Sequence, residues 1–165
     1  EVVQDLMSIL TCMRPQKIYL HQPADKHDTH IAVMSAGLEA IRKTRDHHIP
    51  EKVIGCEVWR GLDWLDDWAK IPMDCSRHPE LFDRLAAVFD SQITGGKRYD
   101  LAVQGRYRAN ATFFDSHSPD QAELVAWGID LTPLVNDPDM SISQFIETHL
   151  KNFQSNVLHR LEKFL

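Results

Sequence analysis

The amino-acid sequence predicts an α/β fold with a mainly parallel sheet flanked by helices. Two observations support this class: helix-like and strand-like patterns alternate along the chain, and three short apolar segments stand between the amphipathic stretches. We expect residues 1–165 to form a single α/β domain or a fragment of one. Its core is expected to cover about residues 1–131, and a C-terminal helix about residues 141–164.

The first part of the chain predicts two helices and two strands. Apolar residues recur at helical spacing over residues 2–13, and Pro15 cannot continue that helix. Residues 17–20 are short, apolar and typical of a buried strand, and residues 52–59 are a second strand candidate. Between the two strands, a second amphipathic helix is marked by the apolar residues Ile31, Met34, Leu38 and Ile41.

The second part predicts three helices and one strand. A helix begins at Pro79 and ends where the glycines of TGGKRYD interrupt the pattern, and residues 99–114 form the next helix. Residues 123–131 are the third strand candidate, and Ser141 and Gln144 have the spacing of a capping box that begins the last helix. This helix is expected to bury Ile142, Phe145, Ile146, Leu150, Phe153, Val157 and Leu161.

Composition excludes several classes of function. The formal net charge of −6 argues against a surface that neutralises phosphates, so we expect no nucleic-acid partner. No apolar run approaches the roughly 20 residues that span a bilayer, so we expect no membrane partner. The three cysteines are far apart and form neither a CxxC pair nor a disulfide framework, which favours a cytoplasmic protein.

The chain opens directly in a helical pattern, and three strands are few for so many helices. We therefore expect it to be the C-terminal portion of a longer domain. Missing strands would leave apolar surface uncovered, so the chain could associate with itself as a homo-oligomer.

The segment LHQPADKHDTHIAV, residues 20–33, is unusually rich in histidine and aspartate. It follows a predicted strand and leads into a helix, which is where ligands gather in open α/β sheets. His27 and His30 are three residues apart, so both rings could meet one ion. Asp25 and Asp28 are close enough in sequence to orient an imidazole through its second nitrogen.

A simpler interpretation stays open for the same segment. Asp28 or Thr29 could do no more than cap the helix. Two histidines are also too few for a catalytic zinc, which normally takes three protein ligands.

The segment PADKHDTHIAVMSAGLEAI resembles the second conserved segment of the LmbE/PIG-L family of zinc-dependent amino-sugar N-deacetylases. CEVW, FDSQ and GRYRANATFF follow in the order of the family, and the similarity covers approximately residues 7–114. With GCEVWRGLDWLDDW and IPM, the chain is similar to the deacetylase-like domain fused to glucosamine-6-phosphate deaminase in some bacterial proteins. The resemblance implies a Rossmann-like fold of which this chain is the C-terminal portion.

The resemblance also implies a chemistry. His30 would be a ligand of Zn²⁺ and His27 would stabilise the oxyanion, with Asp25 as a further catalytic residue, in the deacetylation of an N-acetylated amino sugar or sugar phosphate. The Ala-His-Pro-Asp-Asp motif that supplies the other zinc ligands and the general base of the family is absent from this sequence. A non-catalytic module of the same type, attached to a glucosamine-6-phosphate deaminase, is therefore the alternative.

Four further residues are candidates for substrate binding. Trp64 could stack on a sugar ring, and Arg60 or Arg106 could bind phosphate. Gln92 could orient a site residue by hydrogen bonding. The alternatives are a core position for Trp64, a solvated face for Arg106 and a buried helix-end amide for Gln92.

Overall fold

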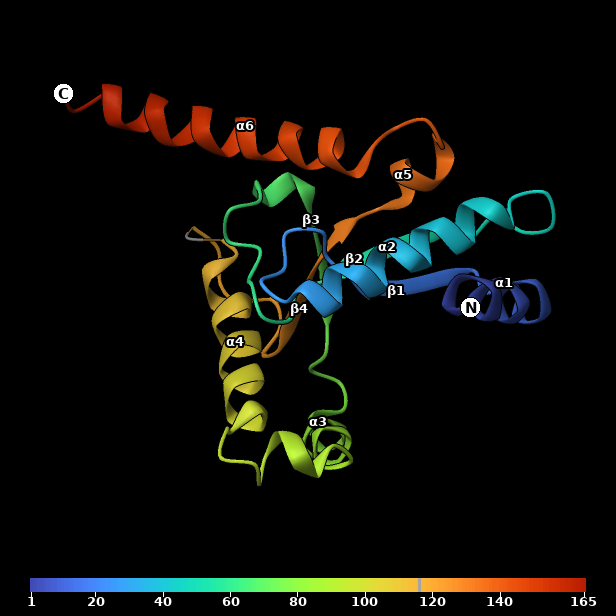
Figure 1. The fold of residues 1–165 in the computed structure, drawn as a ribbon. Helices are drawn as coiled ribbons and strands as arrows, with labels where there is room; N and C mark the ends of the chain where they lie inside the picture. Colours follow the sequence, from blue (N-terminus) through green and yellow to red (C-terminus); the bar gives the residue numbers. More distant parts are fainter. Residues whose placement is uncertain (116) are drawn as a thin grey trace. The chain divides into compact units, whose positions relative to one another are not determined.

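The computed structural model describes residues 1–115 and 117–165 and confirms the α/β class (Figure 1). The described residues divide into two compact units. Residues 1–71 and 128–165 form the first unit, and residues 72–127 form the second. The four strands form one sheet in the order β1-β2-β4-β3, and β4 (Val125–Asp130) contributes residues to both units.

The sheet is mixed, so the prediction of a mainly parallel sheet holds for one pair of strands. β1 (Lys17–His21) and β2 (Lys52–Cys56) are parallel. β4 is antiparallel to β2, with Ile129 opposite Gly55. Alternating helix and strand patterns do not reveal the direction in which a strand enters a sheet, because the connection sets that direction.

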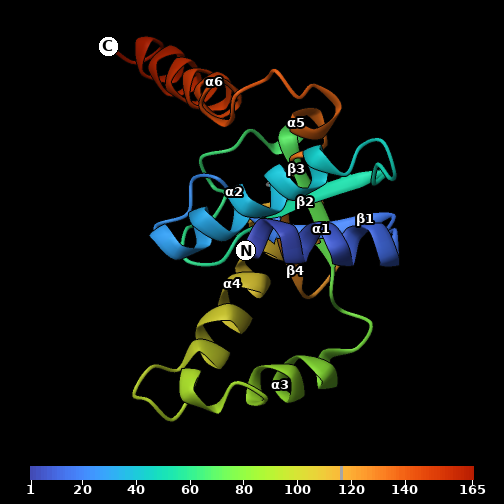
Figure 2. The ribbon, with the colours of Figure 1, turned by 45° about the vertical axis from the view of Figure 1, so that its right-hand side comes forward.

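Two helices pack in succession on one side of β1 in the first unit. α2 (Asp28–Lys43) packs along β1, and α1 (Val2–Met13) packs against α2 (Figure 2). The apolar residues predicted for α2 have the expected spacing, and Met34, Leu38 and Ile41 are buried. The positions of the helices and the strand predicted for the N-terminal 43 residues are therefore confirmed. The burial predicted for the strand is wrong, because no residue of β1 is buried and Tyr19 is exposed.

The sequence patterns did not predict two short elements, one of which is an edge strand of the sheet. The 3-10 turn η1 (Asp67–Ala69) leads directly into β3 (Lys70–Asp74). β3 contains Pro72, which argues against a central strand, and β3 is the last strand in the sheet order. A proline is tolerated at such an edge because one side of the strand needs no ladder hydrogen bonds.

Arg42 fixes the segment that follows β4. The short helix α5 (Thr132–Asn136) begins directly after β4. The Arg42 guanidinium donates from Nε to the carbonyl oxygen of Leu134 at 2.8 Å and from Nη2 to that of Met140 at 2.7 Å. Charge-assisted bonds of this kind are the stronger ones, so the C-terminal end of α2 holds the chain where it leads into the last helix.

The second unit is built around a pair of helices. α3 (Pro79–Ala87) contacts α4 (Tyr99–Phe113), and the rings of Phe82 and Tyr107 meet edge to face with centroids 5.5 Å apart. α3 ends at Ala87, earlier than the apolar pattern predicts, and the short turn η2 (Asp90–Gln92) follows it.

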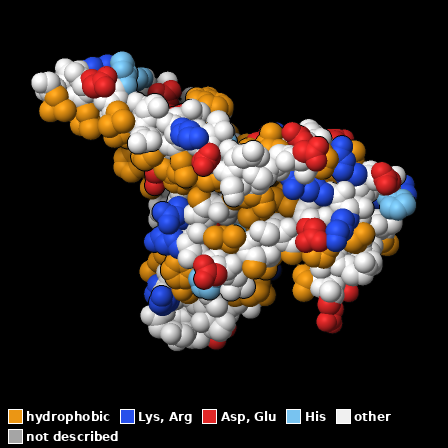
Figure 3. Space-filling view, turned by 45° about the horizontal axis from the view of Figure 1, so that its top comes forward, with side chains coloured by type: hydrophobic (Ala, Val, Ile, Leu, Met, Phe, Trp, Pro, Cys, Tyr) orange, Lys and Arg blue, Asp and Glu red, His pale blue; other side chains and the backbone are white. Residues whose placement is uncertain are grey.

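The last helix, α6 (Ile142–Glu162), confirms one prediction and contradicts another. The capping box is present: Gln144 N donates to Ser141 Oγ and Ser141 N donates to Gln144 Oε1, both at 3.1 Å. None of its described residues is buried, however, and apolar side chains lie along it at the surface (Figure 3). Periodicity identifies an apolar side of a helix but not what covers it. The residues predicted to be buried but exposed are Leu150, Phe153, Val157 and Leu161, while Ile142, Phe145 and Ile146 are half-buried. In the described part of the chain, no helix combines the length and the apolar character that a membrane crossing needs.

The surroundings of His149 predict that the packing of α6 depends on pH. Its ring lies edge-on to Phe145, with centroids 4.9 Å apart, and 6.4 Å from the ring of Trp68. Burial lowers the pKa of His149 below its ordinary value of 6.5, and the charge of Asp66 only partly opposes this effect. The unfolded chain therefore binds a proton at this histidine more readily than the folded chain does. The contribution of His149 to stability is complete above the unfolded pKa. It is lost as the pH falls through the folded pKa.

We expect the melting temperature to fall as the pH is lowered from neutral to mildly acidic values, and we expect His149→Gln to reduce that slope. Thermal unfolding followed by circular dichroism at a series of pH values measures the effect. His159→Gln, at an exposed position of the same helix, is the control and should leave the slope unchanged. Identical slopes for the wild type and His149→Gln would contradict the assignment.

Candidate functional site

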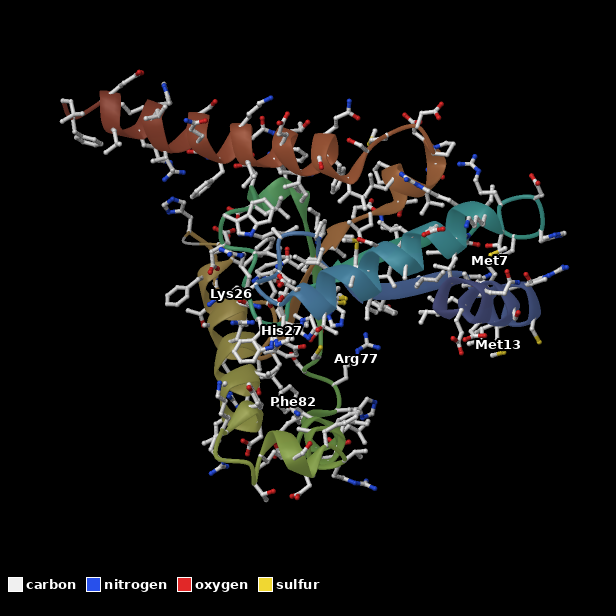
Figure 4. The ribbon with its side chains drawn as sticks, in the orientation of Figure 1. Met7, Met13, Lys26, His27, Arg77 and Phe82 are labelled. Carbon is white, nitrogen blue, oxygen red and sulfur yellow. The ribbon has the colours of Figure 1, made fainter. Side chains whose placement is uncertain are left out.

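The histidine-rich loop connects β1 to α2 in the first unit. His21 is the last residue of β1, His27 is the N-cap of α2, and His30 lies in its first turn. Figure 4 shows His27 at the amino-terminal end of α2. The helix begins at Asp28, and the capping role considered for Asp28 or Thr29 is not observed, because no side chain caps this end.

Asp25 is the centre of this loop. Its side chain is fully buried. Oδ1 accepts a hydrogen bond from the backbone N–H of His27 at 2.9 Å, and Oδ2 accepts one from that of Trp59 at 3.1 Å. Because Trp59 follows β2, this carboxylate joins the loop after β1 to the segment after β2.

The surroundings of Asp25 favour its charged form. Burial by itself would raise the pKa of this carboxyl. The backbone donors of His27 and Trp59, with the nearby His30 ring, outweigh burial and hold the pKa below its ordinary value. Asp25 is thus an ionised carboxylate at neutral pH, and its oxygens can accept hydrogen bonds.

His30 faces that carboxylate with one of its two ring nitrogens. His30 Nδ1 lies 3.3 Å from Asp25 Oδ1. Nδ1 is buried and makes no hydrogen bond of good geometry, although the Asp25 carboxylate is its charged neighbour. The His30 side chain keeps an exposed fraction of 20%. Asp25 therefore lies near Nδ1 without forming a hydrogen bond to it, and the His30 side chain stays partly accessible to solvent.

Three imidazole rings stack at this point. The rings of His21 and His30 are parallel to within 3°, with centroids 3.9 Å apart, and the rings of His27 and His30 are 4.9 Å apart and tilted by 26°. Burial, followed by the proximity of His30, lowers the pKa of His21, although Asp25 acts in the opposite direction. The stack therefore favours a neutral His21.

The stack does not by itself make a zinc site. The lone pair of an imidazole nitrogen lies in the ring plane, so parallel stacked rings do not aim their nitrogens at a common point. Within residues 1–115 and 117–165, no group of three or more His, Cys, Asp or Glu side chains is arranged to hold a metal ion. The described side chains do not fit the complete three-ligand set of a catalytic zinc.

Two buried polar residues beside the site were not predicted. Gln22, fully buried, donates from Nε2 to the carbonyl oxygen of Arg60 at 3.1 Å and accepts from the backbone N–H of Ala24 at 3.0 Å. Glu57, directly after β2, is 6% exposed. Both could have been found in the sequence, because each is a polar residue directly after a strand. This is the edge where loops form sites in α/β sheets.

The remaining predicted residues do not join this cluster. Arg60 contributes through its backbone, while its side chain is exposed. Trp64 is half-buried and lines a groove beside α6. Gln92 and Arg106 belong to the second unit. Gln92 is exposed in η2, so the buried amide considered for it is wrong, and Arg106 is half-buried in α4.

Comparisons with known proteins identify no family for this chain. Neither a scan against protein-family models nor a search of curated proteins finds a match.

Proposed function

We propose that Asp25 and His30 are part of a metal-dependent site that deacetylates an N-acetylated amino sugar or sugar phosphate. The observation that supports this proposal is the contact between the fully buried Asp25 carboxylate and His30 Nδ1, at 3.3 Å. The resemblance of the same segment to the LmbE/PIG-L deacetylases supplies the reaction class. The further ligands that zinc needs would have to come from protein outside the described residues.

In this proposal each residue of the loop has a distinct task. Asp25, 3.3 Å from His30 Nδ1, would hold the ring proton on that nitrogen, and Nε2 would then be the atom of His30 that binds the ion. His27 stands at the N-cap of α2, beside the positive end of the helix dipole, where a developing negative charge is stabilised.

The second candidate is a non-catalytic module of the same type, attached to a glucosamine-6-phosphate deaminase. The parallel stacking of His21 on His30 favours it, because stacked rings do not converge on an ion. This candidate predicts no metal and no hydrolysis of any N-acetyl sugar.

Metal analysis of the intact gene product separates the two candidates. We expect about one zinc per chain in the purified protein, and we expect His30→Ala to lower zinc affinity by at least the 10–100-fold that loss of an orienting partner typically costs. His47→Ala, which removes an exposed histidine on another loop, is the matched control. Metal content that is absent, or that is unchanged in His30→Ala, would contradict the hydrolase proposal.

A further inference from the structure

A groove separate from the histidine cluster lies between the segment 63–68 and α6. Its volume is about 550 Å³. Every lining residue belongs to the first unit, and η1 lies beside α6 in Figure 1. We call it the Trp68 groove; the lining residues that carry the argument are Asp63, Trp64, Asp66, Trp68, Asn156 and Arg160.

The side formed by α6 presents an ordered polar row. Asn156 Nδ2 donates to Asp66 Oδ1 at 3.4 Å, and Arg160 Nε donates to Asn156 Oδ1 at 2.9 Å. Asn156 thus links the two walls of the groove. These contacts hold polar groups in place before any ligand arrives, which lowers the entropic cost of binding.

The other side is aromatic. Trp68 is 74% exposed, which is a large apolar surface to leave in water. The Nε1 atom of Trp64 is buried without a hydrogen-bond partner, although a buried indole N–H usually has one. Trp68 is therefore the aromatic surface of the groove that a bound molecule can reach.

The charge of the groove is negative. Asp63, Asp66 and Asp67 line it, against the single cation Arg160. Asp67 is paired with Lys70 at 2.7 Å, whereas Asp63 is exposed. An exposed indole in a groove lined by carboxylates is a combination that attracts an organic cation, through the ring quadrupole and through direct charge attraction.

We propose that the Trp68 groove binds a protonated amino sugar. Such a molecule carries an ammonium group for Trp68 and Asp63, hydroxyl oxygens for Arg160, and an apolar ring face that stacks on indole. The choice of a sugar as the carrier of the amine rests on the proposed function, whose product would be an amino sugar. The groove itself is independent of His30 and does not need the deacetylation to occur.

Binding is tested by titrating glucosamine into the full chain at slightly acidic pH and following the indole N–H signals of Trp64 and Trp68 by nuclear magnetic resonance. N-acetylglucosamine and glucose, which lack the charge, are the comparison ligands. We expect saturable shifts with glucosamine at millimolar concentration and weaker shifts with both neutral sugars. Trp68→Ala and Asp63→Asn should each weaken binding about tenfold, the effect expected when a cation–π contact or its charge partner is lost.

The controls address folding and the other site. Phe164→Ala, at a residue that is 89% exposed and does not line the groove, should leave binding unchanged. His30→Ala should also leave glucosamine binding unchanged, and Trp68→Ala should leave zinc binding unchanged, so each proposal can fail alone. Equal affinity for the neutral sugars, no saturable shift, or wild-type affinity in Trp68→Ala would overturn the proposed groove.

Discussion

Replacing Asp25 by alanine is expected to lower the free energy of unfolding by about 3 kcal/mol, because each of the two hydrogen bonds that its charged carboxylate accepts is worth about 1.5–3 kcal/mol. The carboxylate accepts the backbone N–H groups of His27 and Trp59. Alanine leaves both donors without this acceptor, and each buried unsatisfied group costs about 1–3 kcal/mol. Urea denaturation followed by circular dichroism measures the loss.

Two matched variants distinguish the network from a general effect of the loop. Asp25→Asn keeps one oxygen acceptor and should lose clearly less stability than Asp25→Ala. Asp28→Ala removes an exposed aspartate from the first turn of α2 and should lower the free energy of unfolding by no more than about 1 kcal/mol. If Asp25→Ala proves as stable as Asp28→Ala, Asp25 does not hold the loop.

Gly55→Val is the second substitution with a large expected effect. A Cβ atom at Gly55 would lie 3.0 Å from side-chain atoms of Ile129 and Leu131 and 3.1 Å from the Cα atom of Gln22. The Gln22 contact is with backbone, which cannot move aside without shifting the loop that carries Asp25. Overpacking of a core typically costs about 1–3 kcal/mol, and we expect Gly55→Val at the upper end of that range.

Thermal unfolding and zinc affinity of the intact protein test this prediction together. We expect both to decrease in Gly55→Val, because the displaced Gln22 disturbs the loop. Gly105→Ala is the control: nothing lies within 4 Å of a Cβ atom there, and the residue is inside α4, so alanine should stabilise the protein by up to about 1 kcal/mol. An unchanged melting temperature in Gly55→Val would show that the strand relaxes around the added side chain.

Sequence patterns were sufficient where a short stretch of chain determines its own structure. The spacing of Met34, Leu38 and Ile41 predicts both α2 and its buried side, and Ser141 with Gln144 predicts the first turn of α6. The sequence also places Asp25 within five residues of His30, and the structure brings the two side chains to 3.3 Å. In each case the partners are close in sequence.

The features that were missed depend on distant partners. The antiparallel direction of β4 is set by the route of the chain that leads into it. Leu150 on α6 is exposed because no other described element covers it. His21 lies nine residues from His30, and only the β1–α2 geometry makes their rings stack. The hydrogen bond from Gln22 to Arg60 spans the two loops that follow β1 and β2, and no local pattern encodes it.

The tautomer of His30 tests most directly whether Asp25 prepares this ring as a ligand. Long-range nitrogen–proton correlation spectra of the imidazole report which ring nitrogen carries the proton. We predict a proton on Nδ1, facing Asp25, and a bare Nε2 whose signal moves when Zn²⁺ is added to the intact protein. A proton on Nε2, with no response of that nitrogen to Zn²⁺, would contradict the assignment.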